Sequence, residues 1–173
     1  MTVRECLRLG TVPLALRSGA ALTWLDVLLR VGASLVFALS IGVERLAHRK
    51  PVDFRPFIII AVASCALCLA ILELGHSLSN SSISIDPAKV ISGVTTGIGF
   101  LGAGALFREQ HYVRGAGSAA AVWAAGAIGI VCGLGFIWLG GILAAVVMLS
   151  LLIGRRFVSD YTAEVEDHGE DQP

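Results

Sequence analysis

Four charged side chains lie inside or beside apolar segments, where a charge needs a partner or water. Asp26 and Arg30 are four residues apart, so they share one face of a helix, where an ion pair can neutralise both. Glu73 and Asp86 lie near the ends of the next apolar segments, at about the same expected depth. The four side chains predict an outer polar cluster, and charges at membrane depth are candidates for function.

Three kinds of chemistry fit this outer polar cluster. A satisfied set of salt bridges that fixes helix packing is the favoured interpretation, and an ion or proton site is the second. The acids around one arginine can also hold a divalent cation, because oxygen ligands suit magnesium. The sequence leaves open whether any metal binds.

A second group of charges, the inner charged cluster, is expected at the opposite ends of the helices. Its members are Glu44, Arg45, Arg55, Arg108 and Arg114. Interfacial anchoring explains the arginines, because lysine and arginine are enriched in cytoplasmic connections. Anchoring does not explain Glu44, which is interpreted equally well as a structural clasp or as a docking point for a partner.

Five glycines fall within twelve residues of one apolar segment. They are Gly93, Gly97, Gly99, Gly102 and Gly104. Small residues four apart let helices pack closely in lipid, and helix packing is the favoured interpretation. The alternative is a broken helix whose carbonyl groups coordinate an ion. The segment lacks the preceding strand and following acid of a nucleotide-binding motif.

The remaining reactive side chains do not form a catalytic pattern. Cys65 and Cys68 share a helix face, but residues at this spacing do not readily form a disulfide, and buried apolar cysteine is the expected role. The four histidines fall in connections or in the tail, and no Ser-His-acid arrangement is found. We expect no enzyme activity and no cofactor.

The composition indicates a membrane protein. Of 173 residues, 55% are hydrophobic and 15% are charged, and the mean hydropathy is +0.80. A soluble domain normally carries about 25% charged residues. Lysine plus arginine and aspartate plus glutamate each number 13, so no charge excess points to nucleic acid.

Apolar stretches long enough to cross a bilayer occur five times, since one span needs about 20 residues. The stretch from Gly115 to Gly154 must hold two helices, with a break at Gly133-Leu134-Gly135. We therefore expect an all-α membrane protein, a glycine-rich bundle of five transmembrane helices. The expected spans are 25–43, 57–74, 90–107, 116–132 and 136–153.

Charge asymmetry predicts the orientation. Eight lysines and arginines fall in the connections on one side and four on the other, which makes the 45–56 and 108–114 loops cytoplasmic. The expected organisation is an N-terminal segment outside (1–24), a five-span domain (25–154) and a disordered acidic cytoplasmic tail (155–173). The first 24 residues do not fit a signal peptide.

Several motifs follow one another in a characteristic order along the chain. Arg30 is followed by Gly42-Val43-Glu44-Arg45, and Asp86-Pro87 precedes the glycine segment. The most specific piece is Gly99-Phe100-Leu101-Gly102-Ala103-Gly104, followed by Val113-Arg114-Gly115 and the alanine-rich helix containing Trp123. In this order the motifs resemble the MgtC/SapB family of bacterial inner-membrane proteins, and the resemblance covers residues 25 to about 153.

The chain departs from the family pattern at three places. Asp53-Phe54-Arg55-Pro56 stands where the family usually has Gly-Leu-Arg-Thr, and Gly117-Ser118 replaces a threonine pair. Many members continue with a soluble cytoplasmic domain, where this chain has the acidic tail.

The resemblance implies a five-span regulator linked to adaptation to low magnesium and, in pathogens, to survival in host cells. It also implies action on another membrane complex such as the ATP synthase. The competing hypothesis is a magnesium or proton transporter or channel, which would require a homo-oligomer because no internal repeat is found. Membrane lipid and a membrane-protein partner are the expected contacts.

Overall fold

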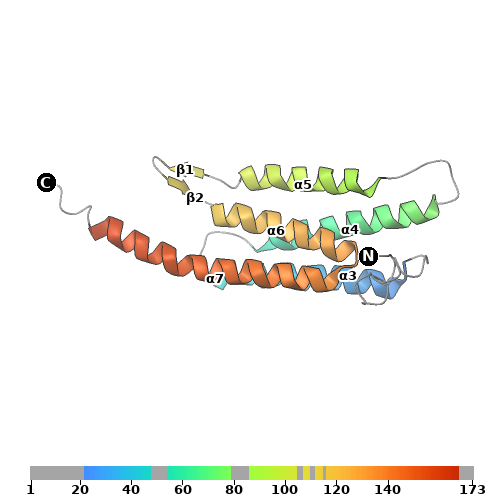
Figure 1. The fold of residues 1–173 in the computed structure, drawn as a ribbon, viewed down its shortest axis with the longest axis horizontal. Helices are drawn as coiled ribbons and strands as arrows, with labels where there is room; N and C mark the ends of the chain where they lie inside the picture. The colour runs from blue at the N-terminus through green and yellow to red at the C-terminus, as the bar shows by residue number, and fades with distance from the viewer. Residues whose placement is uncertain are drawn as a thin grey trace, which may run out of the picture.

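The computed structural model describes residues 22–47, 54–78, 86–104, 107–109, 112–114 and 116–167. The fold is all-helical, with one short hairpin, as Figure 1 shows. The helices are α3 (Trp24–Ala47), α4 (Arg55–Ser77), α5 (Pro87–Gly104), α6 (Ala116–Gly133) and α7 (Ile137–Asp167). Strands β1 (Phe107–Glu109) and β2 (Tyr112–Arg114) pair antiparallel between α5 and α6.

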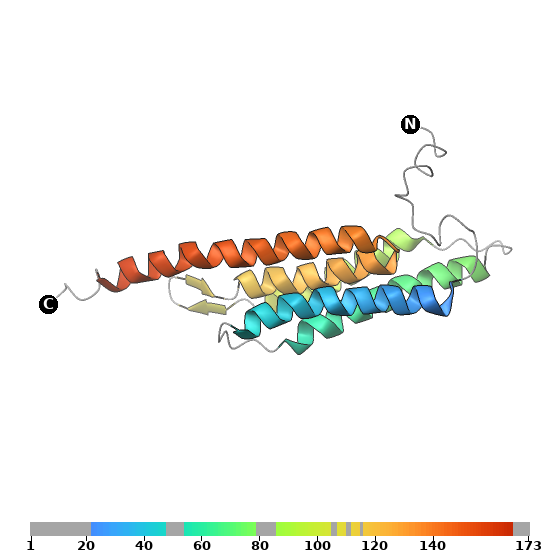
Figure 2. The same ribbon diagram turned by 90° about the horizontal axis from the view of Figure 1, so that it is seen from below.

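The helices run alternately up and down along one long axis (Figures 1 and 2). One end of the bundle, here called the Trp24 end, holds the starts of α3, α5 and α7 and the last turns of α4 and α6. The opposite end, the hairpin end, holds β1, β2 and the start of α6. This arrangement puts charged residues from distant parts of the sequence at the same end.

Helix α6 lies at the centre of the bundle and borders α3, α4, α5 and α7. Its small residues let the neighbours approach, because a glycine presents only backbone to the next helix. A Cβ atom on Gly129 would collide with the carbonyl of Ala61 in α4, and one on Gly133 would lie 2.7 Å from the Cys65 carbonyl. The apolar core therefore forms around two helix backbones in close contact.

The turn between α6 and α7 forms at the predicted break. Gly135 has φ of 93°, in the left-handed region that glycine adopts without strain. The N–H of Phe136 donates to the Val131 carbonyl at 3.0 Å, and that of Gly135 donates to the Cys132 carbonyl at 2.9 Å. These two bonds form the Schellman motif that ends a helix.

Four helices are long and apolar enough to cross a membrane, by length and composition, among the described residues. They are α3, α4, α6 and α7. Helix α5 overlaps the predicted third span but begins at Pro87, three residues earlier, and ends at Gly104. Its glycines, Lys89 and three small hydroxyl residues leave it outside that set. The prediction of an all-α membrane protein is confirmed, and α5 is the described helix that falls outside the set of candidate spans.

The structure differs from the sequence-based expectations at the hairpin end. Residues 107–109 and 112–114, expected as the end of a span and a loop, pair as strands with Arg108 opposite Val113. Helix α7 continues to Asp167, where a disordered tail was expected from 155. It extends beyond the other helices (Figures 1 and 2). Few apolar residues were the reason to expect disorder, but a helix already formed in α7 can continue without a new nucleation step.

Candidate functional site

Arg30 is a charged side chain held inside the bundle. It lies in α3, and only 3% of it is exposed. Its Nη1 group donates a hydrogen bond of 2.9 Å to the backbone carbonyl of Gly133, the last residue of α6. The guanidinium therefore joins α3 to the end of the central helix at the Trp24 end.

The Gly133 carbonyl needs a donor because of how α6 ends. The last carbonyls of a helix have no partner within the helix, and the Schellman bonds satisfy only those of Val131 and Cys132. The same helix end carries the negative pole of the helix dipole, which favours a cation. Arg30 supplies both the donor and the positive charge.

Asp26 stabilises the start of its own helix. Its Oδ2 accepts a hydrogen bond of 2.6 Å from the Thr23 hydroxyl. The Asp26 N–H donates to Thr23 Oγ1 at 3.2 Å, and the Thr23 N–H donates back to Asp26 Oδ2 at 3.4 Å. This reciprocal pair is a capping box in which Asp26 takes the place usually held by Glu or Gln. Asp26 thus has a local partner one turn before Arg30.

The other two acids of the outer polar cluster also bind backbone groups at helix ends. Glu73 Oε2 accepts from the Leu22 N–H at 3.3 Å, which ties α4 to the segment just before α3. Asp86 Oδ1 accepts from the Ala88 N–H at 2.9 Å and caps α5. Both side chains are exposed.

The structure thus brings Asp26, Arg30, Glu73 and Asp86 to the Trp24 end but gives each a backbone or hydroxyl partner. Within the described ranges, the hydrogen bond from Arg30 goes to a carbonyl and not to one of the acids. No group of three or more His, Cys, Asp or Glu side chains in these ranges is arranged to hold a metal ion. A shared role of the four residues stays a prediction.

Other polar residues follow Arg30 along the buried face of α3. Ser34, one turn further on, is fully buried, and its Oγ has no hydrogen-bond partner in the described part of the chain. Ala38 and Ile41 come next and are also fully buried, and Glu44 follows at 8% exposure. Sequence reasoning missed Ser34, although its i+4 spacing from Arg30 on a helix was a usable signal.

The segments that carry the inner charged cluster lie at the hairpin end. A Cβ atom on Gly42 would lie 3.0 Å from Phe54 Cβ, so the last turns of α3 pack against the start of α4. This contact brings the helix end with Glu44 close to the helix start with Arg55. Arg108 and Arg114 lie on the paired strands and Arg45 lies in α3, but their side chains fall outside the described residues.

The predicted packing glycines and the observed ones are largely different. A Cβ atom on Gly102 would lie 3.4 Å from the Ala119 carbonyl of α6, whereas Gly93, Gly97, Gly99 and Gly104 have no such neighbour within 4 Å. The tightest contacts involve α6 and α7 instead. They occur at Gly126, Gly129, Gly133 and Gly140.

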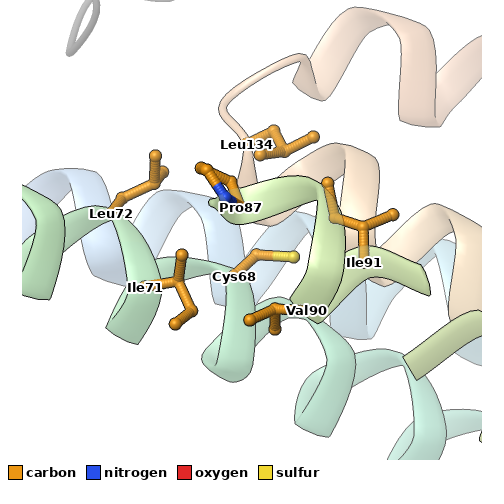
Figure 3. Close-up of a pocket in the computed structure, with 7 residues that line it drawn as sticks. All are labelled: Cys68, Ile71, Leu72, Pro87, Val90, Ile91 and Leu134. Carbon is orange, nitrogen blue, oxygen red and sulfur yellow. The ribbon is translucent and has the colours of Figure 1, made fainter. Parts of the chain in front are cut away.

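A small apolar cavity lies at the Trp24 end. The cavity lies between α4, α5 and the α6–α7 turn (Figure 3). Its lining consists of Cys68, Ile71, Leu72, Pro87, Val90, Ile91 and Leu134. It has no polar lining that would bind a charged ligand. The thiols of Cys65, Cys68 and Cys132 are free and buried, in agreement with their expected role as small apolar side chains.

These features define a class: a helical membrane protein whose bundle is closed by glycine contacts and by a buried arginine at a helix end. Comparison with known proteins identifies the family. The model of the MgtC family matches residues 31–160, and the chain belongs to this family.

Several relatives are about one-third identical to the chain. Protein SapB of Bacillus subtilis is 32% identical over 64% of the chain and 49% of its own length. "Putative magnesium transporter YhiD" of Escherichia coli K12 is 31% identical over 66% of the chain and 54% of its own length. Protein MgtC of Salmonella typhimurium is 32% identical over 62% and 43%. The chain spans about half the length of these relatives, and no solved structure matches it.

Proposed function

We propose that this protein is a bacterial inner-membrane regulator that supports adaptation to low magnesium by acting on a membrane-protein partner. Membership of the MgtC family supports a link to magnesium, since one relative is named as a magnesium transporter and another is MgtC itself. In this proposal the N-terminus lies outside and the hairpin end faces the cytoplasm, as the charge asymmetry favours.

One observation supports a regulator over a transporter. Ser34 and Glu44 are separated by ten residues of α3, or about 15 Å along the helix axis. Ala38 and Ile41 fill the buried face between them, and both are 0% exposed. An ion that leaves Arg30 and Ser34 would have to cross this apolar layer without oxygen ligands, at a high desolvation cost.

The proposed partner is a membrane complex, with the proton-translocating ATP synthase as the first candidate. Helices α3 and α7 present many exposed apolar side chains, among them Val36, Ile142 and Leu149. Such side chains can meet either lipid or a foreign helix. The charged hairpin end would contact the cytoplasmic side of the same partner.

The test compares flux with regulation. Purified protein in liposomes should give no magnesium or proton flux above that of empty liposomes, while circular dichroism confirms that it is folded. Inverted membrane vesicles with the protein should show altered ATP-driven proton pumping relative to vesicles from a deletion strain. Flux in liposomes together with unchanged pumping would contradict the proposal.

A cation transporter is the second candidate, and the polar face of α3 favours it. Arg30, Ser34 and Glu44 are the three buried polar or charged side chains of the described part of α3. The substitution Ala38→Ser separates the two functions. It adds a hydroxyl to the apolar layer, so it should raise flux in a transporter, whereas a regulator should still show none.

A further inference from the structure

A groove runs along the outside of the bundle between α5 and α6. It has a volume of about 230 Å³. Ile91, Thr95 and Ile98 line it from α5, and Trp123, Ala127 and Ile130 line it from α6. Trp123 is 47% exposed, so the groove has an aromatic side chain at its rim.

The outer face of α5 beside this groove is made of small residues. Ser92, Thr96, Gly99 and Ala103 recur at intervals of three and four, so they share one face, and all four are exposed. At about 100° per residue, Phe100 lies about 70° to one side of this face and Thr95 about 70° to the other. Phe100 is 80% exposed. The flat face thus has an aromatic projection on one side and the groove on the other.

The contacts between α5 and α6 fix the depth of these features. Ile98 lies against Gly126, and Gly102 lies against Ala119. Because the two helices run antiparallel, Phe100 is level with Trp123. The projection and the rim of the groove therefore lie at the same depth along the bundle.

We propose that this face binds a second copy of the chain. Two copies inserted the same way into one membrane can be related only by a two-fold axis parallel to the helices, and such an axis brings equal depths together. The small faces of the two α5 helices then meet. Phe100 of each copy enters the groove of its partner, next to Trp123.

The geometry favours a second copy over a lipid chain. A lipid chain would fill the groove but would give Phe100 no groove of its own to enter. In a two-fold dimer, Phe100 of each copy enters the groove of the other copy. Small residues also let two helices approach closely, and packing of this kind drives helix association in lipid. Helix α5 is the described helix that is not apolar enough over its length to count as a membrane span by itself, which suits a helix covered by protein on both sides.

Disulfide cross-linking in native membranes tests the proposal. In a Cys6→Ser background, Thr96→Cys and Ala103→Cys should each give a cross-linked dimer under mild oxidation, because these positions face their equivalents across the axis. The three remaining cysteines are buried and stay in place. Val146→Cys on α7 is the matched control, since Val146 is also exposed, at 55%. It should give no dimer.

A second variant tests the aromatic contact. Phe100→Ala in the Thr96→Cys background should lower the cross-linked fraction by about two- to tenfold, the range expected for losing a packed aromatic pair. Leu139→Ala, at an exposed position on α7, should leave it unchanged. Equal cross-linking by Val146→Cys, or none by Thr96→Cys and Ala103→Cys at normal folded yield, would overturn the proposal in favour of a lipid or a different protein.

Discussion

At the scale of single side chains, Arg30 is the residue whose partner differs most from what its sequence position indicates. The spacing from Asp26 indicates an ion pair within α3, yet Asp26 binds Thr23 and Arg30 reaches α6. An unpaired charge at the bilayer centre costs about 2.5 to 3.5 kcal/mol on insertion scales. A carbonyl at the negative end of a helix can offset part of that cost.

We therefore expect Arg30→Met to destabilise the bundle. The substitution keeps much of the side-chain volume but leaves the Gly133 carbonyl buried without a donor, at a cost of about 1 to 3 kcal/mol. Arg30→Lys should destabilise the bundle less than Arg30→Met, because an ammonium group can still donate to one carbonyl. Unfolding in mixed micelles of increasing SDS content would measure both variants.

The control for this prediction is Lys89→Met, which removes a cation from an exposed position at the same end of the bundle. It should unfold at the wild-type SDS content. An Arg30→Met variant as stable as the wild type would show that the end of α6 does not need this donor.

At the scale of helices, the five helices of the described residues and the α6–α7 break could be predicted from the sequence, because hydropathy and glycine position act locally. Which glycines make the close helix contacts could not be predicted. Segment 93–104 has the higher glycine density, but packing depends on which helix becomes central, and that is a property of the whole bundle. The spacing of Gly126, Gly129 and Gly133 within a long uncharged run was the available signal.

The contrast between the two glycine sets gives a matched pair of variants. Gly129→Ala should abolish or sharply lower the folded yield, because the added Cβ would collide with the Ala61 carbonyl and neither backbone can move far. Gly97→Ala adds the same methyl group where no atom lies within 4 Å. It should fold normally.

The measurement for this pair is the monodisperse fraction after extraction in mild detergent. The monodisperse fraction of Gly102→Ala should fall between those of Gly129→Ala and Gly97→Ala, since its Cβ would be 3.4 Å from the Ala119 carbonyl. The reverse order, with Gly97→Ala the most damaged, would mean that α6 does not pack against α4 as described.

At the scale of the whole molecule, the alternating helices define two ends, and the orientation of these ends in the membrane is a prediction from charge. Ala88 and Ala116 test it as a matched pair. Both are exposed alanines near helix starts, Ala88 at the Trp24 end and Ala116 at the hairpin end.

In a Cys6→Ser background, an impermeant thiol reagent added to intact cells should label Ala88→Cys and leave Ala116→Cys unlabelled. Inverted vesicles should give the reverse pattern, because they expose the cytoplasmic side. Labelling of Ala116→Cys in intact cells would place the hairpin end outside and refute the orientation drawn from the arginine and lysine counts.

The central position of α6 also affects how the protein is made. Translation delivers α3, α4 and α5 to the membrane before α6, although α6 is the helix that borders each of the other described helices. Until α6 arrives, Ala61 and Ile98 lack the glycines that cover them. We therefore expect α3, α4 and α5 to stay loosely associated in lipid during biogenesis, until α6 enters between them. A polypeptide released before Ala116 would expose these uncovered surfaces to membrane proteases.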